Sequence, residues 1–181
     1  LMPTETLRPD AAGDAANIAS QTPSSTEHWD KVDEATADDN TTYVSTTNAS
    51  YEEDDYNLGS TALTSETIDS VDVKFRARSV STAQGDVTVG VRLSTTNTLA
   101  AERTNIGTAF ADFEEAALAR PGGGAWAVSD LNGLQVVLKL KSSVFGVRCT
   151  QEYAEINYTA AVVSPPRFQG VFQAVRRSVT R

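Results

Sequence analysis

The alternation that sets the fold runs through Val71-Asp72-Val73-Lys74-Phe75-Arg76-Ala77-Arg78 and again through Val87-Thr88-Val89-Gly90-Val91-Arg92-Leu93. In both stretches every second side chain is apolar, which is the period of a β-strand with one buried face. The turn Gln84-Gly85-Asp86 lies between them. We therefore predict two neighbouring antiparallel strands.

Other β-rich runs lie between clusters of Gly, Pro, Asn and Asp, at residues 41–46, 108–113, 134–140 and 147–158. Short strands at regular spacing between turn signals indicate a sandwich or a barrel. Hydrophobic residues make up 40% of the 181 residues, which is enough for one domain that folds around its own core. We predict an all-β protein, built as an antiparallel β-sandwich.

Composition divides the chain into three parts. Residues 1–26 are rich in Ala, Thr, Ser and Pro without sustained periodicity, so we predict an extended N-terminal arm with one short strand at residues 4–8. Residues 27–163 form the predicted sandwich domain. Residues 164–181 begin with Ser164-Pro165-Pro166 and form a basic C-terminal tail.

The charge of the chain is unevenly distributed. The formal net charge is −9 and the pI is near 4.6. Residues 27–55 contain ten acidic residues and one lysine, whereas residues 164–181 contain four arginines and no acid. Phosphate binding needs clustered Lys and Arg, so we expect no nucleic acid as partner. No apolar run approaches the roughly 20 residues of a membrane span, and we expect no membrane contact either.

The tail carries an apolar stripe with helical spacing. Such a stripe predicts a short amphipathic helix, although Gly170 and the β-branched valines suit an extended arm that adds a strand to a neighbour nearly as well. In either form the tail is a predicted docking element, and its alternative is to pack on its own domain. The predicted partner-binding residues are Phe168, Val171, Phe172, Val175, Arg176, Arg177 and Arg181.

Catalytic chemistry is sparse. His28 is the sole histidine and Cys149 the sole cysteine, so a triad depends on His28 and a disulfide framework is excluded. We expect an exposed or stacking role for His28 and a buried, unreactive thiol for Cys149. The run Pro121-Gly122-Gly123-Gly124 lacks the Lys-Ser/Thr of a phosphate loop. We therefore expect a protein without enzymatic activity and without a required cofactor.

The acidic segment offers a cation site. A hairpin across residues 41–51 would bring its two acidic ends together, and carboxylate oxygens are the ligands that Ca²⁺ prefers. The spacing matches no EF-hand loop, and the competing interpretation is a solvated acidic face or one that meets a basic partner. The candidate cation-binding residues are Asp38, Asp39, Glu52 and Asp54.

The aromatic residues offer a saccharide site. Trp126 and Tyr153 are the candidate stacking residues, with other tyrosines on the same predicted sheets. The alternative is that these amphipathic rings cap the two ends of the core.

Several segments resemble a known group of proteins. They are Leu7-Arg8-Pro9-Asp10, His28-Trp29-Asp30-Lys31-Val32-Asp33-Glu34, Asp38-Asp39-Asn40-Thr41-Thr42-Tyr43-Val44, residues 68–78, residues 126–138 and residues 149–158. Together these segments, spread over residues 7–158, are similar to β-sandwich structural proteins of tailed viruses of bacteria and archaea.

That resemblance implies a jelly-roll-like sandwich located in a virion, as a capsid decoration, a minor capsid protein or part of a tail appendage. The implied partner is the major capsid protein or another virion protein. The basic tail suits an acidic shell or the acidic face of residues 27–55 on a further copy of the chain. The second arrangement would make a head-to-tail or cyclic oligomer, with a trimer as the first expectation. The main hypothesis is thus a non-enzymatic virion structural protein that binds through its arms and sheet edges. The alternative is a carbohydrate-binding or receptor-binding β-sandwich module of a tail appendage or cell-surface protein.

Overall fold

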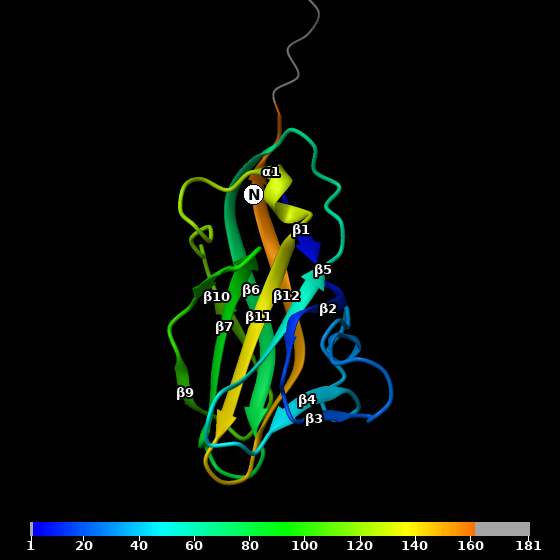
Figure 1. Cartoon of the computed structure of the whole chain (residues 1–181), viewed down its shortest axis with the longest axis vertical. Coiled ribbons are helices and arrows are strands. Elements are labelled where there is room, and N and C mark those ends of the chain that lie inside the picture. The colour runs from blue at the N-terminus through cyan, green and yellow to red at the C-terminus, as the bar shows by residue number, and fades with distance from the viewer. Residues whose placement is uncertain (1, 162–181) are drawn as a thin grey trace, which may run out of the picture.

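The two longest strands, β6 (Thr67–Ser79) and β12 (Val147–Thr159), pair antiparallel along most of their length (Figure 1). They form the middle of one sheet in a computed structural model that describes residues 2–161. We call this the β6 sheet. Its strand order is β10-β6-β12-β4-β3, with β1 also paired to β12. The remaining strands of this sheet are β1 (Thr4–Leu7), β3 (Ser20–Thr22), β4 (Tyr43–Thr46) and β10 (Ala111–Glu115).

The opposing sheet, which we call the β7 sheet, has the strand order β2-β5-β11-β7-β8, with β9 also paired to β7. All of its pairs are antiparallel. Its strands are β2 (Pro9–Ala16), β5 (Glu52–Leu58), β7 (Gly85–Leu93), β8 (Thr96–Leu99), β9 (Arg103–Ile106) and β11 (Leu134–Ser142). The chain is therefore an antiparallel β-sandwich, as its sequence predicts.

The apolar side chains that alternate along the strands fill the space between the two sheets. Val71, Val73 and Phe75 of β6 are at most 2% exposed. The same holds for the alternate apolar residues of the other two main strands, which are Val87, Val89 and Val91 of β7 and Leu134, Val136, Leu138 and Leu140 of β11. Each large apolar side chain removed from water contributes about 1.5–3 kcal/mol to stability. Two short helices, η1 (Trp29–Lys31) and α1 (Val128–Leu131), close loops of the sandwich. The described part of the chain contains no helix long and apolar enough to cross a membrane.

Two expectations about β-strand pairing are wrong. The runs at residues 71–78 and 87–93 are both strands, but β6 and β7 lie in opposite sheets rather than side by side. The chain also changes sheet between β4 and β5, so residues 41–51 form no hairpin. Strand alternation specifies which side chains face the core, and a residue on the inner face of either sheet satisfies that pattern equally well.

The structure contains the short strand expected at residues 4–8, as β1, but it also has strands where the rest of the extended arm was expected. Its segments β1, β2 and β3 pair with β12, β5 and β4 respectively, so they belong to both sheets. Edge strands with one partner need few large apolar residues, which explains why an Ala-rich and Thr-rich segment forms strands without a clear hydrophobic pattern. The predicted tail, residues 164–181, lies outside the described residues.

Candidate functional site

The four candidate cation ligands are not brought together. Asp38 accepts hydrogen bonds from the backbone N–H of Thr42 (3.0 Å) and its hydroxyl (2.8 Å), whereas Glu52 accepts one from the backbone N–H of Ala19 (2.9 Å). Asp39 lies on the outer face of the β6 sheet and Asp54 inside the sandwich. Within residues 2–161, no group of three or more His, Cys, Asp or Glu side chains is arranged to hold a metal ion.

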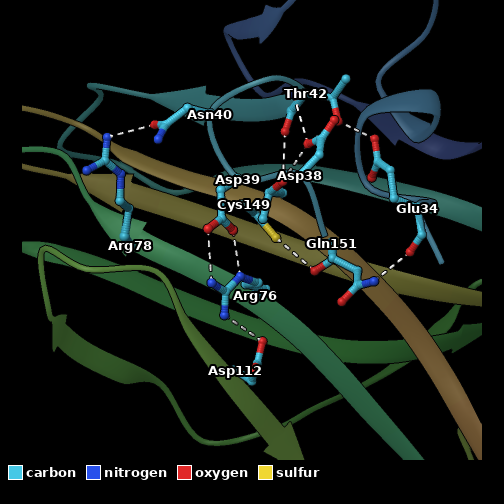
Figure 2. A network of polar contacts seen from close by, with 11 residues as sticks. Glu34, Asp38, Asp39, Asn40, Thr42, Arg76, Arg78, Asp112, Cys149 and Gln151 are labelled. Carbon is cyan, nitrogen blue, oxygen red and sulfur yellow. Dashed lines mark hydrogen bonds and ion pairs between the residues drawn. The ribbon is translucent and has the colours of Figure 1, made fainter. Parts of the chain in front are cut away.

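Instead, the hydrogen bonds of Asp38 and Asp39 hold the loop before β4 against the outer face of the β6 sheet (Figure 2). Asp39 accepts two hydrogen bonds from Arg76 (2.6 and 3.0 Å), and Arg76 also donates to Asp112 (3.0 Å). The hydrogen bonds from Arg76 lower the pKa of Asp39 below its ordinary value. Gln151 donates its amide N–H to the carbonyl oxygen of Glu34 (2.5 Å). The acidic segment therefore has structural partners on this face.

Beside this loop, the outer face of the β6 sheet has a hollow of about 260 Å³. The strand register places Glu114, Lys74 and Tyr153 in one row across β10, β6 and β12. The next row contains Asp112, Arg76 and Gln151. We call this feature the outer-face hollow; its lining residues are Lys74, Phe75, Asp112, Phe113, Glu114, Gln151 and Tyr153.

Several polar groups of the outer-face hollow remain open for a ligand. The carboxylate of Glu114, the hydroxyl of Tyr153 and the amide oxygen of Gln151 form no hydrogen bond with any other described residue. Lys74 donates to Glu155 (2.7 Å), a contact that raises the pKa of Lys74. A hollow with a partly exposed ring and unpartnered oxygens can accept hydrogen bonds from a hydroxyl-rich molecule.

Arg8 fixes one side of this hollow. Its guanidinium lies over the ring of Tyr153, 4.6 Å from the centroid, and it donates to the carbonyl oxygen of Glu34 (2.6 Å). Gln151 donates to the same carbonyl oxygen. Arg8 and Gln151 therefore both hold the segment around Glu34 beside the outer-face hollow. Arg8 lies in the segment expected to be an arm, and its contribution was therefore not predicted.

The other candidate stacking residue, Trp126, is not among the residues that line the outer-face hollow. Its indole N–H donates to the carbonyl oxygen of Leu118 (3.0 Å), and its ring packs against the hydrophobic core. These contacts fit the interpretation in which Trp126 caps one end of the core. Tyr153 alone of the predicted pair is placed beside an open hollow.

Inside the sandwich lies a buried acidic group that sequence analysis did not predict. The carboxylate of Asp54, 0% exposed, accepts hydrogen bonds from the backbone N–H of Ile18 (2.9 Å) and the hydroxyl of Tyr56 (3.0 Å). Nδ1 of His28 lies 2.6 Å from the same carboxylate, and this hydrogen bond raises the pKa of His28. His28 is therefore hydrogen-bonded to a buried carboxylate, and it is not the exposed or stacking residue that the sequence predicts.

Two further groups in the interior are shielded from solvent. Glu152 is 0% exposed, and neither of its carboxylate oxygens has a hydrogen-bond partner among the described residues. Burial raises its pKa well above the ordinary value. Cys149 is also fully buried, and burial raises the pKa of its thiol, which disfavours the nucleophilic thiolate.

Comparison with known proteins gives little further guidance. No family model matches the chain, and no curated protein matches it. One solved structure with a similar shape is "Family 16 Carbohydrate Binding Module-2", at 14% sequence identity and a TM-score of 0.40. That match covers 82% of this chain and 88% of the other.

Proposed function

We propose that this chain is a non-catalytic carbohydrate-binding module, and that a saccharide binds in the outer-face hollow. The observation that carries the proposal is the row of Glu114, Lys74 and Tyr153 beside Gln151, which combines a ring with unpartnered oxygens. Ring carbons of a sugar can pack on Tyr153, while its hydroxyls donate to the carboxylate and amide oxygens.

The charge of the hollow favours an uncharged saccharide. Its acidic residues are Asp112 and Glu114, and its lysine already pairs with Glu155. A uronic acid or a sulfated sugar would bring further negative charge next to these carboxylates, on a chain whose net charge is −9. We therefore expect neutral oligosaccharides to bind more tightly than acidic ones.

A glycan array followed by calorimetric titration of the best saccharide tests the proposal. Tyr153→Ala and Glu114→Gln are each expected to weaken binding about tenfold, the equivalent of about 1.4 kcal/mol. Tyr43→Ala is the matched control, because Tyr43 stacks with Arg148 and does not line the hollow. The proposal fails if no saccharide binds, or if the control weakens binding as much as the two hollow variants do.

The virion structural role that the sequence resemblance implies stays a prediction. It depends on docking by residues 164–181, which lie outside the described residues, and the expected N-terminal arm is part of the sandwich. Self-association as a trimer, contact with a capsid protein and location in a virion are likewise predictions. A carbohydrate-binding module on a tail appendage would combine both hypotheses.

A further inference from the structure

A second hollow, of about 160 Å³, opens on the side of the molecule where β2 and β5 meet the segment before η1. We call it the N-terminal pocket. Its size is comparable to that of cavities of roughly 150 Å³ that hold a six-carbon ring. The small side chains of Ala12, Ala15 and Ala16 leave this space free, and Trp29 and Tyr56 supply aromatic surface. It shares no lining residue with the outer-face hollow.

The polar groups of this pocket are mainly acceptors. The side-chain oxygen of Gln21 is shielded from solvent and accepts no hydrogen bond from any described residue, while its amide N–H donates to the carbonyl oxygen of Thr26 (2.8 Å). The exposed carboxylate of Glu27 has no ion-pair partner within residues 2–161. The hydroxyl of Thr26 donates to Asp30 (2.6 Å), so it is not a free donor.

The cations near the pocket are already paired. His28 is bound to the buried carboxylate of Asp54. The ammonium group of Lys31, with a side chain only 3% exposed, lies 3.1 Å from Asp30 and donates to the hydroxyl of Thr26 (2.5 Å). The unpartnered groups that remain are therefore negative or electron-rich. A ligand that supplies both positive charge and hydrogen-bond donors complements them.

The wall of the pocket is held in a fixed shape. Thr26 has φ +71°, which is an unfavourable conformation for a β-branched residue. It is held there by contacts with Lys31, Asp30 and Gln21. Strained residues persist where surrounding contacts over-determine them, and such residues concentrate at binding sites. The pocket thus has a preformed wall around its open acceptors.

We propose that the N-terminal pocket binds a primary alkylammonium group, with the alkyl chain against Trp29 and the alanines and the ammonium near Gln21 and Glu27. An ammonium group carries three N–H donors, which match the unpartnered oxygens of Gln21 and Glu27. The same chemistry can come from a free amine or from a lysine side chain of another protein. This inference is independent of the proposed saccharide site.

The test is an NMR titration of the full chain with n-butylammonium chloride, following the Trp29 indole N–H signal. n-Butanol at matched ionic strength is the neutral counterpart, and capped lysine (N-acetyl-lysine-methylamide) represents a protein side chain. A saturable shift with n-butylammonium and a clearly weaker one with n-butanol are expected. Binding of n-butylammonium without binding of capped lysine would mean that the pocket takes a free small-molecule amine. Binding of both would mean that it also accepts a lysine side chain.

Variants separate pocket binding from general attraction to an acidic protein. Glu27→Gln is expected to weaken n-butylammonium binding about two- to fivefold, as for an exposed ion pair. Ala16→Leu, which fills the pocket, is expected to abolish the saturable shift. Glu66→Gln removes the same charge from the loop between β5 and β6 and serves as the control. Equal binding of n-butanol, equal loss in the control, or no saturable shift would each overturn the proposal.

Discussion

At the residue scale, the most informative side chains are the acids inside the sandwich. Asp54 is stabilised by three hydrogen-bond donors, whereas Glu152 opposite has none among the described residues. A buried carboxylate without a partner is costly when charged, and it responds by holding its proton. Burial also raises the pKa of Asp55, to about 6. These residues tie the stability of the fold to pH.

Glu152→Gln should reduce the loss of stability at alkaline pH. The unfolded chain releases the Glu152 proton near the ordinary pKa of 4.5, whereas the folded chain holds it to a much higher pH. The free energy of unfolding of the natural protein therefore falls as pH rises between these two pKa values. The free energy of unfolding of the variant, compared with that of the natural protein, should therefore be higher at pH 8 than at pH 4.

Urea unfolding at a series of pH values measures this difference, with Glu114→Gln as the control, because the Glu114 carboxylate is exposed and forms no hydrogen bond with any other described residue. Parallel pH profiles for Glu152→Gln and the natural protein would show that Glu152 is not the responsible group.

His28→Ala should destabilise the fold, and by an amount that depends on pH. Since its hydrogen bond with Asp54 raises the pKa of His28, the contribution of this pair is fully present below pH 6.5. It is lost as pH rises through the higher pKa of the folded state. At pH 6 we expect a loss of about 1.5–3 kcal/mol, typical of a hydrogen bond to a charged group.

Thermal or urea unfolding at pH 6 and pH 9 checks this expectation. His28→Asn keeps a donor without the charge and should lose less at pH 6. An equal loss at both pH values would mean that packing, and not the proton on His28, accounts for the effect.

At the element scale, β2 shows how an alanine-rich segment becomes part of a sheet. The register between β2 and β5 shifts between Ala12 and Ala16, and Gly13 lies within that irregular stretch. A Cβ atom at Gly13 would lie 2.6 Å from the carbonyl oxygen of Asp55 and 2.7 Å from the side-chain oxygen of Gln135. Glycine therefore permits the close approach of β2 to the sheet.

Gly13→Ala should weaken this edge of the β7 sheet. We expect a loss of about 1–3 kcal/mol, the usual cost of forcing an atom into a tightly packed site. Gly107→Ala is the matched control, because an added Cβ there meets no atom within 4 Å. Amide hydrogen exchange should show faster exchange in β2 and β5 for Gly13→Ala only. Unchanged exchange in β2 would contradict the close-approach argument.

At the scale of the whole molecule, the described residues 2–161 contain two complete sheets and a continuous core. The sandwich therefore has the apolar contacts that it needs to fold without residues 164–181. The two proposed binding sites also lie entirely within the sandwich.

Deleting residues 164–181 should leave a folded chain that still binds saccharide in the outer-face hollow but no longer assembles with its partners. Thermal unfolding and calorimetric titration check the first part, and solution mass together with incorporation into purified particles checks the second. Normal assembly of the truncated chain would show that residues 164–181 are not needed for docking.

The sequence by itself determined the β-sandwich class and the inner faces of its main strands, because the two-residue alternation of β6, β7 and β11 specifies which side chains leave water. It also indicated Tyr153 as a candidate binding residue and Cys149 as a buried thiol. These predictions depend only on local spacing and on the chemistry of single side chains.

Only the tertiary structure decided which strands pair, since an inward-facing valine packs equally well from either sheet. It placed β6 and β7 in opposite sheets, separated the acids of residues 38–55, and put Asp54 and Glu152 in the same core. It also assembled both hollows from residues far apart in the chain, such as Tyr153 with Glu114 and Gln21 with Ala16. Such contacts depend on how the sheets stack, and no local pattern contains that information.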